Sequence, residues 1–315
     1  MLTYTVHRLV LMLPVALVVS TIVFLLLYLT PGDPVGVMLG PDATEQQKSE
    51  LRVRLGLDQP AHVQLLRWYG RLVQGDLGTS IFLHKKVTLA FLERLEPTLM
   101  LTLLALTCGV LIGLPAGILA AKMHGSWFDM VAMLTAITGV SMPTFWIGLN
   151  LIFIFAVTLG WLPVAGYQPL SRGVWEHLRY MLMPAFTIGL AQSALLARMT
   201  RSMMLDVLSQ DYIRTARAKG QAELWILSRH ALRNAIIPLI TTIGLSFALL
   251  LGGAVISEQI FNIPGVGRLL IQGVSRRDYP LVQGVLLIIA AVYMCVNLLV
   301  DLTYALLDPR IRHSD

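Results

Sequence analysis

Charged side chains are scarce in this 315-residue chain. Only 13% of its residues are Asp, Glu, Lys or Arg, whereas 56% are apolar. Because soluble domains usually contain about 25% charged residues, this composition argues against a soluble protein. The net charge of +6 is not gathered in a soluble basic domain, which argues against a nucleic-acid-binding protein as well.

Residues that build catalytic, metal or nucleotide sites are also missing. The two cysteines, Cys108 and Cys295, fall in apolar stretches, where they act as small apolar side chains, so we expect no disulfide. The seven histidines show no ligand spacing, and we expect no metal site. None of the lysines completes a Gly-x4-Gly-Lys-Ser/Thr phosphate loop. We therefore predict no catalytic residue and no bound ATP or Mg²⁺ in this chain.

What the chain does have is long uncharged apolar stretches. A helix needs about 20 apolar residues to cross the hydrocarbon core of a membrane. Six stretches qualify: Leu9–Leu29, Thr98–Ala121, Met130–Leu159, Met181–Ala197, Ala235–Ser257 and Leu281–Val300, the last with a polar extension to Leu307. The sequence therefore predicts an all-α integral membrane protein with six transmembrane helices.

Basic residues in the short loops predict the orientation of these helices. With the N-terminus inside, the cytoplasmic segments hold eleven Lys and Arg and the short outer loops hold five. The positive-inside rule then places both termini in the cytoplasm. We divide the chain into a first transmembrane helix (1–30), an extracytoplasmic region (31–97), a five-helix core (98–308) and a cytoplasmic tail (309–315). Two short helices, 44–54 and 61–73, are expected in the extracytoplasmic region, which we interpret as a small cap.

Small and polar residues mark two kinds of helix surface. Small residues recur at every fourth position of the second span, which predicts close helix packing: Ala105, Gly109, Gly113, Gly117 and Ala121. Polar residues inside the spans either make hydrogen bonds between helices or line a translocation pathway, and both readings stay open. The pathway candidates are Asn150, Gln192, Ser193, Asn297 and Asp301.

The middle of every predicted span lacks Asp, Glu, Lys, Arg and His. An ion-coupled secondary carrier usually binds its ion through such groups and often contains an internal repeat. Neither is visible, so this class is a remote alternative, as is a membrane scaffold without a transport role. Energy for transport would then come from a separate ATPase partner.

The longest cytoplasmic loop, 198–234, is the best candidate for docking that partner. Asp211–Gly220 predicts a short helix with an acid near its start, bases toward its end and a terminating Gly. A second helix is expected from Ala222 toward Ala235. Small residues would let the first helix enter a cleft, and its bases would pair with acids around the rim. The candidate docking residues are Asp211, Tyr212, Arg214, Thr215, Ala216, Arg217, Ala218, Lys219 and Gly220.

This loop resembles the EAA loop of ABC importer permeases, which forms the coupling helices that dock onto ATPase subunits. Arg214, Thr215 and Ala216 stand where Glu-Ala-Ala would, and Gly220 matches, whereas His230, Arg233 and Pro238 depart from the second half. Two sequence motifs resemble those of the dipeptide/oligopeptide/nickel/glutathione branch of these permeases. They are Asp-Tyr-Ile-Arg-Thr-Ala-Arg-Ala-Lys-Gly and, after it, His-Ala-Leu-Arg-Asn-Ala. Further segments share that likeness, among them Pro31–Pro34, Leu55–Pro60, Gly75–Gly78, Ser141–Pro143, Ala197–Arg201, Glu258–Phe261, Pro264–Gly267, Arg277–Pro280, Asn297–Asp301 and Asp308–Arg312.

The resemblance implies a type I importer in the inner membrane. Its expected partners are a second, homologous permease subunit, two ATP-binding subunits and an extracytoplasmic solute-binding protein. The expected cargo is a dipeptide or oligopeptide. A nickel chelate, glutathione or another small solute remains an alternative, because the binding protein sets much of the choice.

Overall fold

The computed structural model of the chain describes residues 2–29, 34–40 and 43–307. The described residues are almost entirely helical, with no strand and only one isolated antiparallel bridge, between Thr79 and Lys86. The predicted tail 309–315 and the first residues of the Pro31–Pro34 motif lie outside these ranges. The chain divides into two compact units, Leu2–Glu96 with Gly265–Met294, and Pro97–Pro264 with the end of the chain from Cys295.

Helices of membrane-spanning length are present in both units. Four pass by length and composition, α1 (Leu2–Leu29), α5 (Val87–Lys122), α8 (Val174–Leu208) and α14 (Tyr279–Leu307), and six do if each of two bent pairs counts as one span. Large apolar side chains are exposed along them, such as Leu13 at 68% and Leu111 at 69%. Such surfaces are expected where a helix faces lipid. This agrees with the predicted all-α membrane protein.

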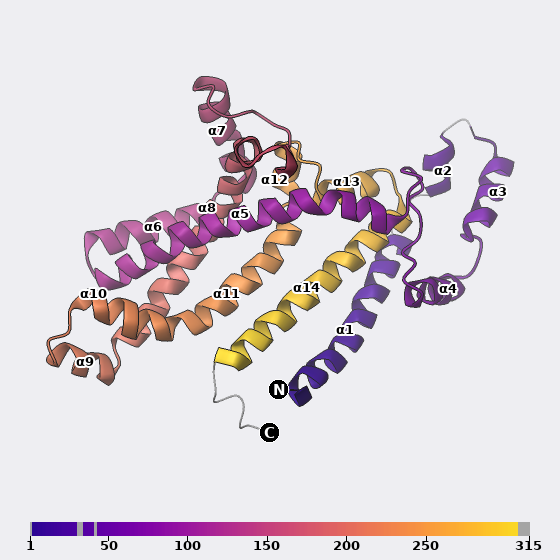
Figure 1. Cartoon of the computed structure of the whole chain (residues 1–315). Helices are drawn as coiled ribbons and strands as arrows, with labels where there is room; N and C mark the ends of the chain where they lie inside the picture. The colour runs from indigo at the N-terminus through magenta and orange to yellow at the C-terminus, as the bar shows by residue number, and fades with distance from the viewer. Residues whose placement is uncertain (1, 30–33, 41–42, 308–315) are drawn as a thin grey trace. The chain divides into compact units, whose positions relative to one another are not determined.

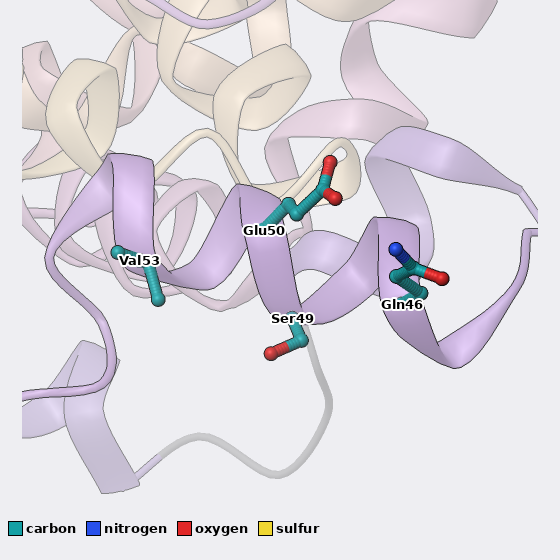
Figure 2. A pocket seen from close by; sticks show the side chains of 4 residues that line it. All are labelled: Gln46, Ser49, Glu50 and Val53. Carbon is teal, nitrogen blue, oxygen red and sulfur yellow. The ribbon is translucent and has the colours of Figure 1, made fainter.

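The first unit holds α1 and three short helices, α2 (Pro34–Leu39), α3 (Glu45–Leu55) and α4 (Ala61–Val73). The predicted helices 44–54 and 61–73 are thus confirmed as α3 and α4. A capping box starts α3, because Gln47 N donates to Thr44 Oγ1 at 3.3 Å and Thr44 N donates to Gln47 Oε1 at 3.0 Å. A shallow pocket on α3 is lined by side chains of this one helix, Gln46, Ser49, Glu50 and Val53 (Figure 2).

A buried carboxylate joins two further parts of the same unit. Asp278 is 1% exposed and precedes α14, where it accepts hydrogen bonds from Ser80 Oγ at 2.5 Å, Phe82 N at 3.3 Å and Leu281 N at 3.2 Å. These bonds fasten the segment after α4 to the start of α14. An apolar cluster of α5, α13 (Val266–Ser275) and α14 packs beside it, with Val87, Leu269 and Val285 fully or almost fully buried.

In the second unit the third predicted span is broken rather than straight. It consists of α6 (Trp127–Ser141), α7 (Thr144–Leu151) and the π-helical η1 (Ile152–Thr158), with a 100° bend between α6 and α7. Pro143 caps α7 and has no N–H to continue the hydrogen bonds of α6, which accounts for the break. Apolarity alone does not reveal such a bend.

The fifth predicted span is also irregular. The expected second helix of the cytoplasmic loop, from Ala222 toward Ala235, forms as α10 (Glu223–Trp225) and a π-helical stretch, η3 (Ile226–Ala231), which run directly into α11 (Leu232–Gly253). The helical path bends by 55° near Pro238. A short α12 (Val255–Ile260) follows, and its Glu258 is completely buried and accepts a hydrogen bond from Thr98 Oγ1 at 2.6 Å.

The predicted small-residue face of α5 is confirmed as a packing surface against α8. A Cβ added to Gly113 would lie 2.6 Å from Ser193 O, and one added to Gly117 would lie 2.5 Å from Ala197 O. On α8, a Cβ at Gly189 would lie 2.7 Å from Ala105 O. The two backbones therefore approach so closely that only glycine fits at these positions. The glycines of α11 differ from these, because Gly244 faces Val300 whereas Gly252 and Gly253 have open space around them.

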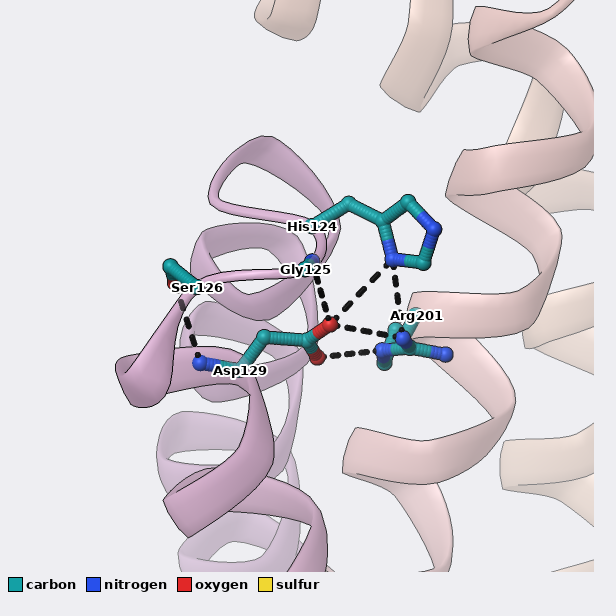
Figure 3. A network of polar contacts seen from close by, with 5 residues as sticks. All are labelled: His124, Gly125, Ser126, Asp129 and Arg201. Carbon is teal, nitrogen blue, oxygen red and sulfur yellow. Dashed lines mark hydrogen bonds and ion pairs between the residues drawn. The ribbon is translucent and has the colours of Figure 1, made fainter.

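A charged cluster ties α6 to the far end of α8 (Figure 3). Arg201 holds both carboxylate oxygens of Asp129, with Nε to Oδ1 at 2.5 Å and a second nitrogen to Oδ2 at 2.7 Å. The same carboxylate accepts from Gly125 N at 3.1 Å and lies 3.2 Å from His124 Nδ1. The Asp129 side chain is only 6% exposed, so this bidentate pair fixes the turn between α5 and α6 onto α8. In Figure 1, α6 and α8 run alongside each other, and their packing is extensive.

Replacing Gly113 with Ala is expected to destabilise the protein by about 1–3 kcal/mol, because backbone atoms of α8 occupy the space that the methyl group needs. Thermal unfolding of the detergent-solubilised protein measures the change. Gly252→Ala is the matched control, since this helical glycine has no neighbour within 4 Å and should gain slightly from helix propensity. Equal effects of the two substitutions would contradict the packing assignment.

Asp129→Asn and Arg201→Gln are each expected to lower stability by roughly 3 kcal/mol, because each leaves a poorly solvated charge or dipole without its partner. The double variant should lose less than the sum of the two single losses. The same unfolding assay, run as a double-mutant cycle, gives the coupling between the side chains. Additive losses would show that the pair contributes nothing as a unit.

Candidate coupling site

The predicted docking helix forms as α9 (Asp211–Ala218), directly after α8. Asp211 lies in its first turn and Arg217 in its last, as the helix dipole favours. Gly220 follows with φ +74°, a left-handed conformation that ends the helix at little cost for glycine. Figure 1 shows α9 and α10 as a short helical hairpin at the ends of α8 and α11.

One face of α9 is buried in its own chain. Ile213 is fully buried and Ala216 is 8% exposed, and both pack against Ile226 of η3 with Leu208 of α8 beside them. The expectation that Ala216 enters a partner's cleft is therefore not supported by its position, because this side chain already fills the chain's own core. Ile213 was not among the predicted site residues, although an apolar residue three positions before Ala216 is a signal for a shared buried face.

The opposite face of α9 is open and carries the other predicted residues. Every one of them is exposed: Asp211, Tyr212, Arg214, Thr215, Arg217, Ala218, Lys219 and Gly220. Arg214 pairs with Asp211 at 3.3 Å, but its side chain stays 74% exposed, so this pair adds little stability. The face thus presents the small side chains of Thr215 and Ala218 beside Arg214, and Lys219 follows at the end of the helix.

Arg217 fastens the end of α9 to α10. Its guanidinium donates to both carboxylate oxygens of Glu223, at 2.8 and 3.3 Å. The hydrogen bond with Glu223 raises the pKa of Arg217 above its ordinary value, so the cation persists at any physiological pH. Arg217 is therefore committed to its own chain and serves as a brace between the two short helices.

Residues that depart from the general coupling motif also hold the hairpin together. His230 Nε2 lies 2.9 Å from Gln221 Oε1, and Asn234 Nδ2 donates to Tyr212 Oη at 2.7 Å. A buried apolar cluster of Leu227, Ala231 and Ala235 then joins this segment to Ala121 of α5 and Met204 of α8. His230 and Asn234 thus stabilise the hairpin. The general coupling motif alone does not predict these contacts.

The predicted pathway residues are not gathered in one place by hydrogen bonds. Asn150 Nδ2 donates to Trp146 O of its own helix, and Ser193 Oγ donates to Leu190 O. Gln192 does bridge two helices, with Nε2 at 2.5 Å from Ser246 Oγ of α11. The Oδ1 atom of Asn297 is buried and accepts no hydrogen bond from any described residue. Asp301 is half-buried near the end of α14.

No group of three or more His, Cys, Asp and Glu side chains within the described ranges could hold a metal ion. Residues 113–313 match the family described as "Binding-protein-dependent transport system inner membrane component", and residues 1–102 match its N-terminal family.

Similar proteins include a Brucella suis chain named provisionally as a peptide transport system permease, 46% identical over 96% of both chains. Another is the glutathione transport system permease protein GsiC of Salmonella paratyphi A, 44% identical over the whole of both. A chain of the inward-facing MetNI methionine ABC transporter shares the fold, with a TM-score of 0.58 and 17% identity over 70% of this chain and 97% of its own. This chain belongs to the family of inner-membrane components of binding-protein-dependent ABC transport systems.

Proposed function

We propose that the chain is one permease subunit of an ATP-driven importer, lining half of the pathway for short peptides delivered by a solute-binding protein. The observation that carries the proposal is α9, an exposed helix whose inner face is anchored in its own chain and whose outer face is open. Peptide and glutathione permeases among the relatives support this cargo. Both cargoes are short peptides, so glutathione stays the alternative closest to the proposal.

The anchoring of α9 suggests how a partner's motion would reach the spans. A push on the outer face moves Ile213 and Ala216, which pack on η3 and on the end of α8. η3 continues into α11, so α8 and α11 move with the helix. Interiors are packed too densely to absorb such a displacement locally. ATP binding by the partner would thereby change the pathway between the spans, and hydrolysis would reset it.

The chain acts in this proposal without chemistry of its own. ATP and Mg²⁺ are bound by two ATPase subunits, one of which docks on α9 here and the other on a homologous second permease. Both termini face the cytoplasm, together with α9 and the turn between α5 and α6, which the excess of basic residues there supports. The extracytoplasmic region, 31–97, faces the opposite side, where the binding protein delivers its ligand.

Substrate-dependent ATP hydrolysis tests the proposed function. The chain is purified with its co-expressed permease, ATPase and binding-protein partners in lipid nanodiscs, and ATPase activity is measured with and without ligand. Di- or tripeptides should stimulate hydrolysis only when the binding protein is present. Stimulation by glutathione alone among peptides would narrow the cargo, and stimulation only by a nickel chelate would replace it. Hydrolysis that never responds to any ligand would contradict an importer.

Ala218→Glu is expected to lower ATP-driven uptake at least about tenfold, because a carboxylate on the exposed face of α9 would repel an acidic rim on the partner. Uptake into proteoliposomes and ATPase activity are measured together. Ala218→Gln is the control, since its amide has nearly the size of the Glu carboxylate but no charge, and it should keep much more of the uptake than Ala218→Glu. Normal uptake by Ala218→Glu would remove the outer face of α9 from the docking surface.

A further inference from the structure

Helix α4 (Ala61–Val73) is amphipathic, with its apolar and basic residues on opposite sides. At 100° per residue, Trp68, Leu72 and Leu65 share one side, and Leu66 and Val73 extend it along one edge. Arg67 and Arg71 lie on the opposite side. A helix with aromatic and aliphatic residues on one face and arginines on the other is typical of segments that lie in a membrane interface.

Helix α4 packs along α1, which is a candidate membrane span. Trp68 is buried and its ring lies 5.7 Å from that of Phe24. Tyr69 Oη shares hydrogen bonds with Ser20 Oγ at 2.9 Å and Thr21 Oγ1 at 2.8 Å. The first apolar stretch runs on to Leu29, so these contacts lie roughly 7–14 Å inside its outer end at 1.5 Å per residue. One helix of the region that the sequence indicated to be a small cap thus packs along the first span.

The apolar edge of α4 has no cover within the described part of the chain. Leu66 is 69% exposed and Val73 is 88% exposed. At the same level α1 also exposes apolar side chains, Leu17 at 60% and Val18 at 54%. If this edge were in water, the protein would lose the favourable free energy of burying these apolar side chains. Beside a lipid-facing span, the acyl chains of the bilayer are the nearest apolar medium.

The arginine side of α4 is complementary to phosphate. Arg67 and Arg71 are both exposed, and neither forms an ion pair with another described residue. From a helix lying in the plane of the interface, their long side chains can reach the level of the lipid headgroups. Guanidinium groups bind phosphate oxygens in a bidentate manner.

We propose that α4 is an in-plane membrane helix that binds anionic phospholipid, with Leu66 and Val73 among the acyl chains and Arg67 and Arg71 on the headgroup phosphates. With the orientation proposed above, this lipid belongs to the outer leaflet. The bound layer would hold α4 against α1 while the rest of the transporter moves. The depth of α4 can be measured whether or not the proposed cargo is correct, so the two proposals fail separately.

Site-directed spin labelling in the complete, co-expressed transporter tests the depth. Cys108 and Cys295 are replaced by Ala, and single cysteines are introduced as Leu66→Cys, Val73→Cys or, as the control, Val53→Cys on α3, which is 61% exposed. Collisions of the nitroxide with oxygen, which concentrates in lipid, are compared with those of a water-soluble nickel chelate. Labels at 66 and 73 should favour oxygen, and the label at 53 should favour the chelate.

Other outcomes overturn the proposal. Labels at 66 and 73 that meet the chelate as readily as the label at 53 would place α4 in water. Labels shielded from both reagents would show that another protein covers the helix. Each variant must co-purify with its partner subunits in the same yield as the unmodified chain, which shows that the complex has assembled whatever its cargo.

Native mass spectrometry of the same transporter tests the headgroup contact. Arg67→Gln and Arg71→Gln should each weaken retention of phosphatidylglycerol about fivefold while retention of phosphatidylcholine stays unchanged. Lys48→Gln on α3 is the charge-matched control and should retain both lipids as the unmodified chain does. Unchanged phosphatidylglycerol retention in the double variant would remove the two arginines from the lipid site.

Discussion

The close approach of α8 to α5 is the constraint on which the second unit depends. Glycines bring the two backbones together where any side chain would collide with carbonyl oxygens. A helix held in this way can serve as a common support. The same α8 is joined to α6 by Arg201 and Asp129, and to α11 by Gln192 and Ser246. It then leads into α9, so the proposed docking helix is attached to a helix that packs against α5, α6 and α11.

The two faces of α9 have different roles, although the sequence predicted docking for the segment as a whole. The inner face, Ile213 and Ala216, makes the helix part of its own chain, and Arg217 braces it through Glu223. The outer face has small and basic side chains and is the part left for a partner. A helix that transmits a partner's motion needs both a rigid attachment to its own chain and an exposed surface for the partner. A substitution at Ala216 would therefore disturb the attachment before it disturbed docking.

Much of this structure could be predicted from the sequence, because apolar length, helix caps and four-residue periodicity are local signals. They gave the all-α membrane class, α3, α4, α9 and the glycine surface of α5. The 100° bend was missed because one apolar stretch runs through it, although Pro143 is itself a signal for a break in a helix. The inward position of Ala216 and the bonds from His230 and Asn234 depend on how η3 folds back, which is a tertiary effect. The packing of α4 against α1 is likewise a tertiary effect.

Cysteine cross-linking between α9 and the co-purified ATPase tests the central claim most directly. In a chain without Cys108 and Cys295, single cysteines replace Thr215, Ala218 or Ala216, and a short bifunctional reagent is added in the presence and absence of ATP. The account predicts cross-links to the ATPase from positions 215 and 218, with yields that change with ATP, and little or none from position 216. Equal cross-linking from position 216, or none from 215 and 218, would contradict it.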